Sequence, residues 1–240
     1  MRHAVAVAAA VLCPPLLGAW SVPGAPPGAG RPLPERMADT GGGSQLITAE
    51  AATTGSTTGT VTWWQHSGTG GRWEEAGSAP ARFGANGLAD GATRRQGTGT
   101  TPTGLYDLPF AFGIEPAPEG VRHPYRRVGP DSWCCQDNDS RAYNRWSEPL
   151  AADCRPSEAE HLVGYRQQYA YALVIGFNYR KPVRGRGAGV FLHVHGDGAT
   201  AGCVSVPADA MRRLLRWADP SRAPHIAVGT ADGPTAITRY

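Results

Sequence analysis

The sequence predicts a mainly-β fold, a β-sandwich or β-barrel with one or two short helices. Two observations carry this prediction. Short runs of β-branched and aromatic residues recur along the chain between turn residues, in keeping with 32 Gly and 21 Pro among 240 residues. A clear amphipathic helix is indicated at one segment, residues 207–218. A hydrophobic content of 41% is enough for one core.

Residues 1–25 are typical of a secretory signal peptide. A short basic start precedes an apolar run at residues 4–17, and small residues follow it. The apolar run is too short to remain as a membrane-spanning helix. We therefore expect export to the cell envelope or the medium, with cleavage near Ala19 or near Ala25.

The rest of the chain divides into a linker, one domain and a tail. Residues 26–57 are rich in Pro, Gly, Ala and Thr and lack apolar periodicity, which predicts a disordered linker. The folded domain is expected to cover residues 58–232. Residues 233–240 are expected to form a tail.

The first half of the domain shows strands joined by turns. Residues 60–64 (TVTWW) are β-branched and aromatic, as in a strand, and residues 67–71 follow as a turn. The pair Asn86-Gly87 predicts a second turn. Residues 97–104 are rich in Gly and Thr and predict a tight turn that feeds a strand at 105–108.

The second half begins with an irregular region, residues 115–165, that predicts a long loop with the role of a lid or a substrate wall. Residues 169–177 form a nearly continuous apolar run, as in a buried central strand, and residues 189–195 form the next strand. The helix at 207–218 has Pro207 in its first turn. A last strand is expected at 226–228.

Four cysteines lie beyond the signal region, at positions 134, 135, 154 and 203. An exported chain resides in an oxidising compartment, where disulfides persist. A bond between Cys154 and either Cys134 or Cys135 is expected, because adjacent cysteines rarely pair with each other. Cys203 and one member of the adjacent pair would then stay free, and a free thiol in an exported protein points to reactivity.

Charge sets limits on the partners of the protein. The formal net charge is +3 and the basic residues are scattered, which disfavours a nucleic-acid partner. We expect a monomer with no membrane span after removal of the signal peptide, and no cofactor or metal.

One segment combines residues that together favour nucleophilic catalysis. His193 and His195 alternate along a strand and therefore project from the same face. A glycine-rich turn then returns the chain to Cys203, within reach of an imidazole. A neighbouring imidazolium lowers the pKa of a thiol and so activates it. Gly202 allows unusual backbone angles, and the amides around it and Cys203 can face an oxyanion.

Two other interpretations use the same residues. A cysteine in a mainly-β domain is often buried filler, and a strand histidine is often a satisfied core residue. Alternatively, His193, His195 and Asp197 have the alternating spacing of metal ligands, and Cys203 could complete a zinc site of a hydrolase.

The run from Phe191 to Pro207 carries a resemblance to a known family. Its strand histidine, glycine-rich turn and Thr-Ala-Gly-Cys sequence at 200–203 resemble the signature of L,D-transpeptidase (YkuD-type) catalytic domains, in particular a secreted bacterial subgroup. Residues 101–104 (TPTG) look like the upstream Thr-Pro-x-Gly turn of that family, and the region around Trp133 and Tyr143 is also similar. The resemblance covers about residues 60 to 230.

The resemblance implies an L,D-transpeptidase-like β fold and assigns roles to residues. Cys203 would be the nucleophile and a strand histidine its base, with His193 favoured and His195 kept as the alternative. Gly202 would belong to the catalytic turn. The residues expected to contact substrate are Thr200, Ser205, Tyr143 and Asn144, of which Ser205 occupies a position that often binds substrate in the family.

The implied activity is remodelling of peptidoglycan, and so cell-wall organisation and cell shape. Cys203 would attack the carbonyl of the third residue of a tetrapeptide stem and expel the terminal D-alanine. An amine of a neighbouring stem would then resolve the acyl-enzyme into a cross-link. Water in place of that amine gives an L,D-carboxypeptidase or amidase, and a non-catalytic wall-binding module is a further alternative.

Overall fold

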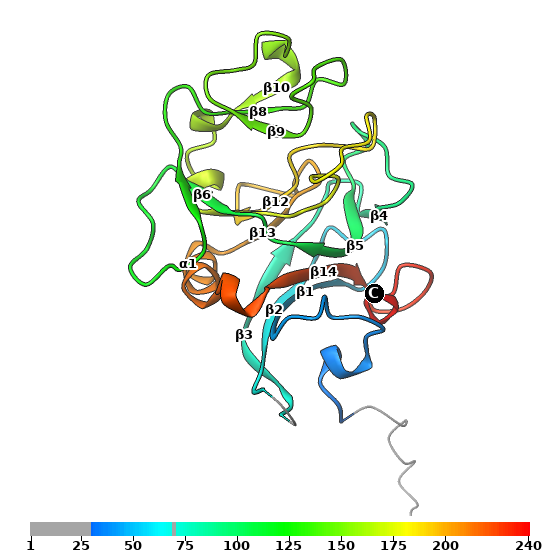
Figure 1. Cartoon of the computed structure of the whole chain (residues 1–240). Helices are drawn as coiled ribbons and strands as arrows, with labels where there is room; N and C mark the ends of the chain where they lie inside the picture. Colours follow the sequence, from blue (N-terminus) through cyan, green and yellow to red (C-terminus); the bar gives the residue numbers. More distant parts are fainter. Residues whose placement is uncertain (1–29, 69–70) are drawn as a thin grey trace, which may run out of the picture. The chain divides into compact units, whose positions relative to one another are not determined.

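The computed structural model describes residues 30–68 and 71–240, and one compact unit covers Arg31–Tyr240. The expected signal peptide at 1–25 lies outside the described residues. The mainly-β prediction is confirmed: within the described ranges the chain forms fourteen strands, one α-helix and six short 3-10 helices (Figure 1).

Eleven strands join in one mixed sheet, in the order β4-β5-β14-β1-β2-β3-β13-β12-β11-β6-β7. Their bounds are β1 (Gln45–Ala51), β2 (Thr58–His66), β3 (Trp73–Arg82), β4 (Leu88–Asp90), β5 (Thr101–Asp107), β6 (Ala111–Gly113), β7 (Tyr125–Arg127), β11 (Ala172–Val174), β12 (Phe191–Val194), β13 (Val204–Val206) and β14 (His225–Thr230).

The other elements are shorter or lie outside this sheet. A second sheet has the order β10-β8-β9. Its strands are β8 (Trp133–Cys135), β9 (Arg145–Ser147) and β10 (Ala159–His161), the α-helix is α1 (Ala208–Trp217), and the 3-10 helices are η1 (Leu33–Arg36), η2 (Pro156–Glu158), η3 (Leu162–Gly164), η4 (Gln168–Ala170), η5 (Pro220–Arg222) and η6 (Ile237–Arg239).

Strand β1 corrects the expected linker at 26–57. It pairs in parallel with β14 and antiparallel with β2, so it lies inside the sheet. Leu46, Ile47 and Ala49 are fully buried. The strand was missed because one short apolar run stands within Gly- and Thr-rich sequence, and its pairing with β14 joins segments from opposite ends of the domain. The domain therefore begins well before residue 58.

The C-terminal residues correct the expected tail at 233–240. Ile237 is fully buried on η6 and packs in a cluster with Leu46. The Tyr240 hydroxyl lies 2.7 Å from Thr103 Oγ1, on strand β5. The chain end therefore belongs to the domain, held by contacts that no local pattern could reveal.

The other strand expectations hold with shifted bounds. The strand expected at 60–64 lies within β2 and the one expected at 226–228 lies within β14. β5 starts at Thr101, inside the expected turn at 97–104. The expected long strand at 169–177 is reduced to β11, because the 3-10 helix η4 occupies its first residues.

Helix α1 confirms the helix expected at 207–218 and supports the strands that carry the site. Pro207 occupies the N-cap position, one residue before the helix. Met211, Leu214 and Leu215 are fully buried in the main core together with residues of β12 and β13. Their spacing places them on one helix face, so burial of apolar surface fixes α1 against the sheet.

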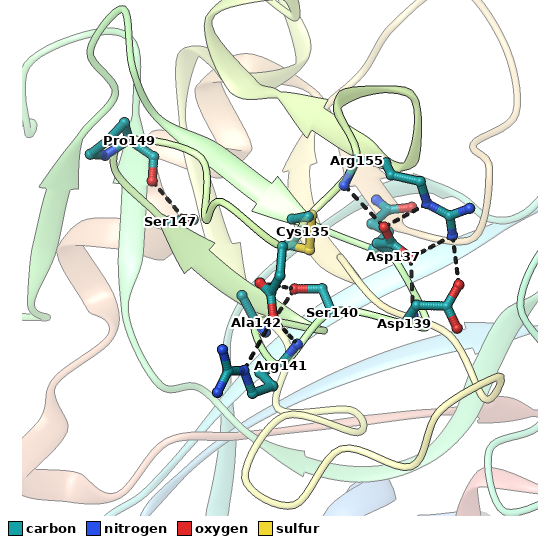
Figure 2. Close-up of a disulfide and its surroundings, with 12 residues drawn as sticks. Cys135, Asp137, Asp139, Ser140, Arg141, Ala142, Ser147, Pro149 and Arg155 are labelled. Carbon is teal, nitrogen blue, oxygen red and sulfur yellow. Dashed lines mark hydrogen bonds and ion pairs between the residues drawn. A yellow bond between two sulfur atoms is a disulfide. The ribbon is translucent and has the colours of Figure 1, made fainter.

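The region 115–165 has more structure than the expected loop. Strands β8, β9 and β10 form the small sheet, and a disulfide joins Cys135 of β8 to Cys154 (Figure 2). Next to it, the Arg155 guanidinium donates to both Asp137 carboxylate oxygens, at 2.6 and 2.8 Å. We call residues 128–164 the stapled insert. Its ordering is consistent with the wall expected from the sequence.

None of the helices in the described part of the chain combines the length and the apolar character that crossing a bilayer requires.

Candidate active site

Two adjacent parallel strands place Cys203 and His193 on the wall of one cavity. β12 pairs with β13 so that Leu192 faces Val204 and His193 faces Ser205. Cys203 directly precedes β13 and therefore lies beside Phe191. The Phe191 amide donates to Cys203 Sγ at 3.3 Å, and the thiol donates to the Gly189 carbonyl at 3.4 Å.

The glycine-rich turn before Cys203 is held by the segment after β3. Arg82 donates to the Gly196 carbonyl at 2.6 Å, and Thr200 exchanges backbone hydrogen bonds with Phe83 and Ala85, at 2.8 Å each. These hydrogen bonds to a segment distant in sequence fix the backbone of the turn. These bonds hold the loop that carries the Cys203 thiol at two places, which would suit the positioning of a reactive group.

Hydroxyl groups fix the backbone of Cys203. Thr200 Oγ1 donates to the Cys203 carbonyl at 2.6 Å, and Thr101 Oγ1 donates to the same oxygen at 3.1 Å. Thr101 also accepts from the Gly84 amide at 2.8 Å. The Thr-Pro-x-Gly sequence that begins at Thr101 thus contributes directly to the site. The Thr200 hydroxyl thus bonds to the backbone of Cys203, and Thr200 also lines a cavity next to Cys203.

Gly202 is required by both backbone angle and space. Its φ of +140° lies in the region that favours glycine. A Cβ at this position would lie 2.8 Å from Arg94 Nη2 and 2.9 Å from the Thr100 carbonyl oxygen. The Gly202 amide donates to Thr200 Oγ1 at 3.1 Å, so the structure does not present it as a free oxyanion donor.

Two cavities meet at Cys203. The first, of about 230 Å³, is lined by Arg94, Gln96, Gln136 and Glu160 and by backbone around Gly189. We call it the Arg94 cavity. The second, of about 210 Å³, is lined by His193, Tyr165, Gln168 and Tyr169 and by the glycine-rich turn. We call it the His193 cavity. Cys203 and Glu160 line both.

His193 is oriented with one ring nitrogen available as a base. Its Nδ1 lies 2.7 Å from the Val194 carbonyl oxygen. Because a carbonyl only accepts, Nδ1 carries the proton in the neutral ring and Nε2 holds the lone pair. The Tyr169 ring packs edge-on against the imidazole at 5.6 Å between centroids. Burial lowers the pKa of His193 to about 4, so the ring is neutral at pH 7.

The charge state of the pair differs from the sequence expectation. Burial, followed by the nearby Glu160 carboxylate, raises the pKa of the Cys203 thiol to about 12. We expected an imidazolium to lower this pKa. That expectation is wrong for the resting site, because desolvation disfavours the charged form of both side chains. The resting pair is a neutral thiol and a neutral imidazole.

His195 lies away from the thiol. Its Nδ1 is 2.9 Å from Ser205 Oγ, and the ring lines neither of the two cavities at Cys203. The strand ends at Val194, so the alternation that would align His195 with His193 does not continue. Ser205 is fully buried with its hydroxyl on His195, and it too is absent from both cavity walls.

The geometry also bears on the metal-site alternative. Over residues 30–68 and 71–240 no three His, Cys, Asp or Glu side chains gather as metal ligands would. His193 hydrogen-bonds to a backbone carbonyl and His195 to a hydroxyl. The run His193, His195 and Asp197 therefore does not form a ligand set.

Tyr143 and Asn144 support a cavity wall rather than line it. The Tyr143 hydroxyl accepts from the Gly187 amide at 3.0 Å and donates to Gln96 Oε1 at 2.7 Å. Asn144 Oδ1 accepts from the Gly189 amide at 3.0 Å. Both side chains are buried, so the structure places them behind the wall that faces Cys203.

Two charged residues of the site have no counterpart in the sequence prediction. Arg94 lies between β4 and β5, and Glu160 lies on β10 of the stapled insert. Glu160 accepts from the Tyr169 hydroxyl at 2.8 Å. Neither residue stands in a local pattern that signals a site. Only pairing of distant strands brings them next to Cys203.

The comparisons with known proteins agree with this geometry. The family model described as the L,D-transpeptidase catalytic domain, YkuD, matches residues 56–234. A search of curated proteins found no match to the chain. The matched range contains both Cys203 cavities and the two strands that form the Cys203–His193 pair. The chain therefore belongs to the YkuD family of L,D-transpeptidase catalytic domains.

Proposed function

We propose that this protein is a cysteine-dependent L,D-transpeptidase that acts on tetrapeptide stems of peptidoglycan, with Cys203 as nucleophile and His193 as base. One observation carries the proposal: a buried thiol lies where two cavities meet, and one of these cavities holds an imidazole with a free lone pair. Acyl transfer between two peptides needs such a thiol with room on both sides.

The first step forms an acyl-enzyme. His193 Nε2 takes the Sγ proton as Cys203 attacks the carbonyl carbon of the third stem residue. The tetrahedral intermediate then breaks the C–N bond to D-alanine, and His193 returns the proton to the leaving nitrogen. Because the resting pair is neutral, proton transfer accompanies attack rather than preceding it.

The second step reverses these roles. The amine of a neighbouring stem attacks the thioester carbonyl, His193 takes a proton from that amine, and the C–S bond breaks. The thiolate is then reprotonated by His193. We assign the oxyanion to the Cys203 amide, because the Gly202 amide is engaged by Thr200.

The two-sided cavity favours transpeptidation over hydrolysis. Water would need no binding space of its own, whereas an acceptor stem needs a wall to dock on. The His193 cavity, of about 210 Å³, offers that space on the side of the base. We therefore propose cross-linking as the main activity.

We also propose that the protein is exported. Its substrate would lie outside the cytoplasmic membrane, and the Cys135–Cys154 disulfide suits an oxidising compartment. The basic-then-apolar sequence at residues 1–25 supports the same proposal.

The test is incubation of the full chain with a tetrapeptide stem and mass spectrometry of the products. The proposal predicts D-alanine release and a cross-linked dimer, both lost in Cys203→Ala. Cys134→Ala is the matched control, since Cys134 is the other free and buried cysteine among residues 30–68 and 71–240. Turnover that survives in Cys203→Ala would contradict the mechanism. Hydrolysis without any dimer would contradict the transfer step.

A further inference from the structure

Arg94 presents a charge that the described protein does not neutralise. Its side chain is 8% exposed and lines the Arg94 cavity. Nε donates to the Thr100 carbonyl at 2.7 Å and Nη1 to the Arg186 carbonyl at 3.1 Å. Among the described residues no carboxylate lies within ion-pair distance of this guanidinium, and Nη2 has no hydrogen-bond acceptor.

A buried guanidinium without a counter-ion is costly, so its retention at a cavity wall points to a ligand anion. Burial lowers the pKa of Arg94, in keeping with a guanidinium that no carboxylate of the described protein contacts. Arginine is also the side chain best suited to hold a carboxylate with two parallel hydrogen bonds.

Glu160 gives the same cavity a charge of the opposite sign. Its carboxylate accepts from Tyr169, a neutral donor, and in the described part of the chain it forms no ion pair with Arg94 or another cation. Burial raises the pKa of Glu160, while hydrogen bonds with Tyr169 and Gln136 oppose that rise, so only neutral groups of the protein stabilise its charge. A ligand carrying both a carboxylate and an ammonium group would compensate both residues.

The reaction decides which part of the substrate enters this cavity. The leaving nitrogen and the acceptor nitrogen both exchange a proton with His193, so both must lie in the His193 cavity. His193 does not line the Arg94 cavity. The Arg94 cavity is therefore left for the acyl part of the donor, beginning at the residue whose carbonyl is bound to Cys203.

We propose that the Arg94 cavity binds a free α-amino acid head group at the end of the donor residue's side chain, with the carboxylate on Arg94 and the ammonium on Glu160. The two residues then determine which donor stems the enzyme accepts. This inference rests on the proposed function. It adds a specificity site to it, formed by the β4–β5 connection and the stapled insert.

The test uses three tetrapeptides that differ only in the third residue. One carries diaminopimelic acid, one its side-chain carboxamide, and one 2-aminopimelic acid, which lacks the side-chain ammonium. Calorimetry on the full-length Cys203→Ala protein measures the dissociation constant of each. We expect each of the two altered peptides to bind at least tenfold more weakly than the first.

Variants assign each loss to one side chain. In the double variant Arg94→Gln, Cys203→Ala, the carboxamide peptide should bind less than twofold more weakly than the diaminopimelic acid peptide. The 2-aminopimelic acid peptide should still bind at least tenfold more weakly. In Glu160→Gln, Cys203→Ala the reverse should hold. Because Arg94 also bonds backbone, the peptide series on unmutated Arg94 and Glu160 supplies the answer even if a variant fails to fold.

The outcomes separate this inference from the proposed function. Equal binding of the three peptides would overturn the specificity site. Equal kcat/KM for the three donors with wild-type protein would overturn it as well and leave the activity established. Head-group-dependent binding without any D-alanine release would count against the proposed function alone.

Discussion

The Thr101 hydroxyl donates a 3.1 Å hydrogen bond to the carbonyl oxygen of Cys203, which follows 102 residues later in the chain. The same hydroxyl accepts from the Gly84 amide, and Thr101 is fully buried. One side chain of the Thr-Pro-x-Gly turn thus connects three segments at the proposed nucleophile. The relationship gives this turn a positioning role.

Replacement of that hydroxyl tests the positioning role. Thr101→Val keeps the shape but leaves the Gly84 amide and one acceptor site of the Cys203 carbonyl unsatisfied, which should cost about 1–3 kcal/mol of unfolding free energy. We expect kcat to fall at least tenfold with little change in KM, while Thr101→Ser retains most of both. Urea unfolding curves would measure the stability loss, and steady-state kinetics under conditions where each variant is folded would measure kcat and KM. Wild-type kcat in a folded Thr101→Val protein would refute the role.

The pH dependence of turnover reports the state of His193. The base must be neutral to accept the thiol proton, and burial lowers its pKa to about 4. We therefore expect kcat/KM to stay level from pH 8 to about pH 5 and to decline only as the pH approaches 4. His195→Gln should leave this profile unchanged, because His195 lies outside both cavities. An acid limb at the ordinary histidine pKa that persists in Glu160→Gln, whose own titration is removed, would show that the resting ring is not desolvated.

Stability should depend on pH through the same ring. A folded-state pKa below the unfolded value means that the unfolded chain binds the proton more tightly. Stability is therefore full above pH 6.5 and declines as the pH falls toward 4, by roughly 1.4 kcal/mol per pH unit for this group. Urea unfolding between pH 7 and 4.5 should show a shallower decline for His193→Gln than for wild type. Parallel curves would contradict the buried neutral histidine.

The disulfide should stabilise the wall that carries Glu160. Cys135 and Cys154 are 19 residues apart, and closure of a loop of this order is worth roughly 3 kcal/mol. Cys154→Ser should speed amide hydrogen exchange across β8 and β10 and raise KM for the tetrapeptide. The increase in exchange rate should be smaller in the eleven-stranded sheet. Cys134→Ala, which keeps the bond, is the control. Unchanged exchange in the insert would show that the Asp137–Arg155 pair and the small sheet suffice without the bond.

The candidate pair could be predicted from the sequence because its signals are local. A strand histidine, a glycine-rich turn and a cysteine ten residues later place His193 on β12 and Cys203 directly before the neighbouring strand β13, where both line one cavity. The choice of His193 over His195 was not accessible in the same way. It depends on the strand ending at Val194, where the chain turns and His195 bonds to Ser205.

Features that depend on the pairing of segments far apart in the chain could not be predicted from the sequence. The sequence predicts linker at β1 because the strand's own seven residues carry little signal, whereas its position between β2 and β14 decides its structure. Arg94 and Glu160 meet Cys203 only through the sheet and the stapled insert. The raised pKa of Cys203 was missed for a related reason, because the degree of burial is a property of the whole packed site.

Trapping the acyl-enzyme tests the central claim most directly. The full chain would be mixed with a tetrapeptide stem without acceptor, quenched in acid within one turnover, and analysed by intact mass and peptide mapping. We predict a mass increase equal to the tripeptide acyl group, on the peptide that contains Cys203 and on none that contains Cys134. An adduct elsewhere, or D-alanine release with no covalent adduct at any time, would contradict a thioester mechanism at Cys203.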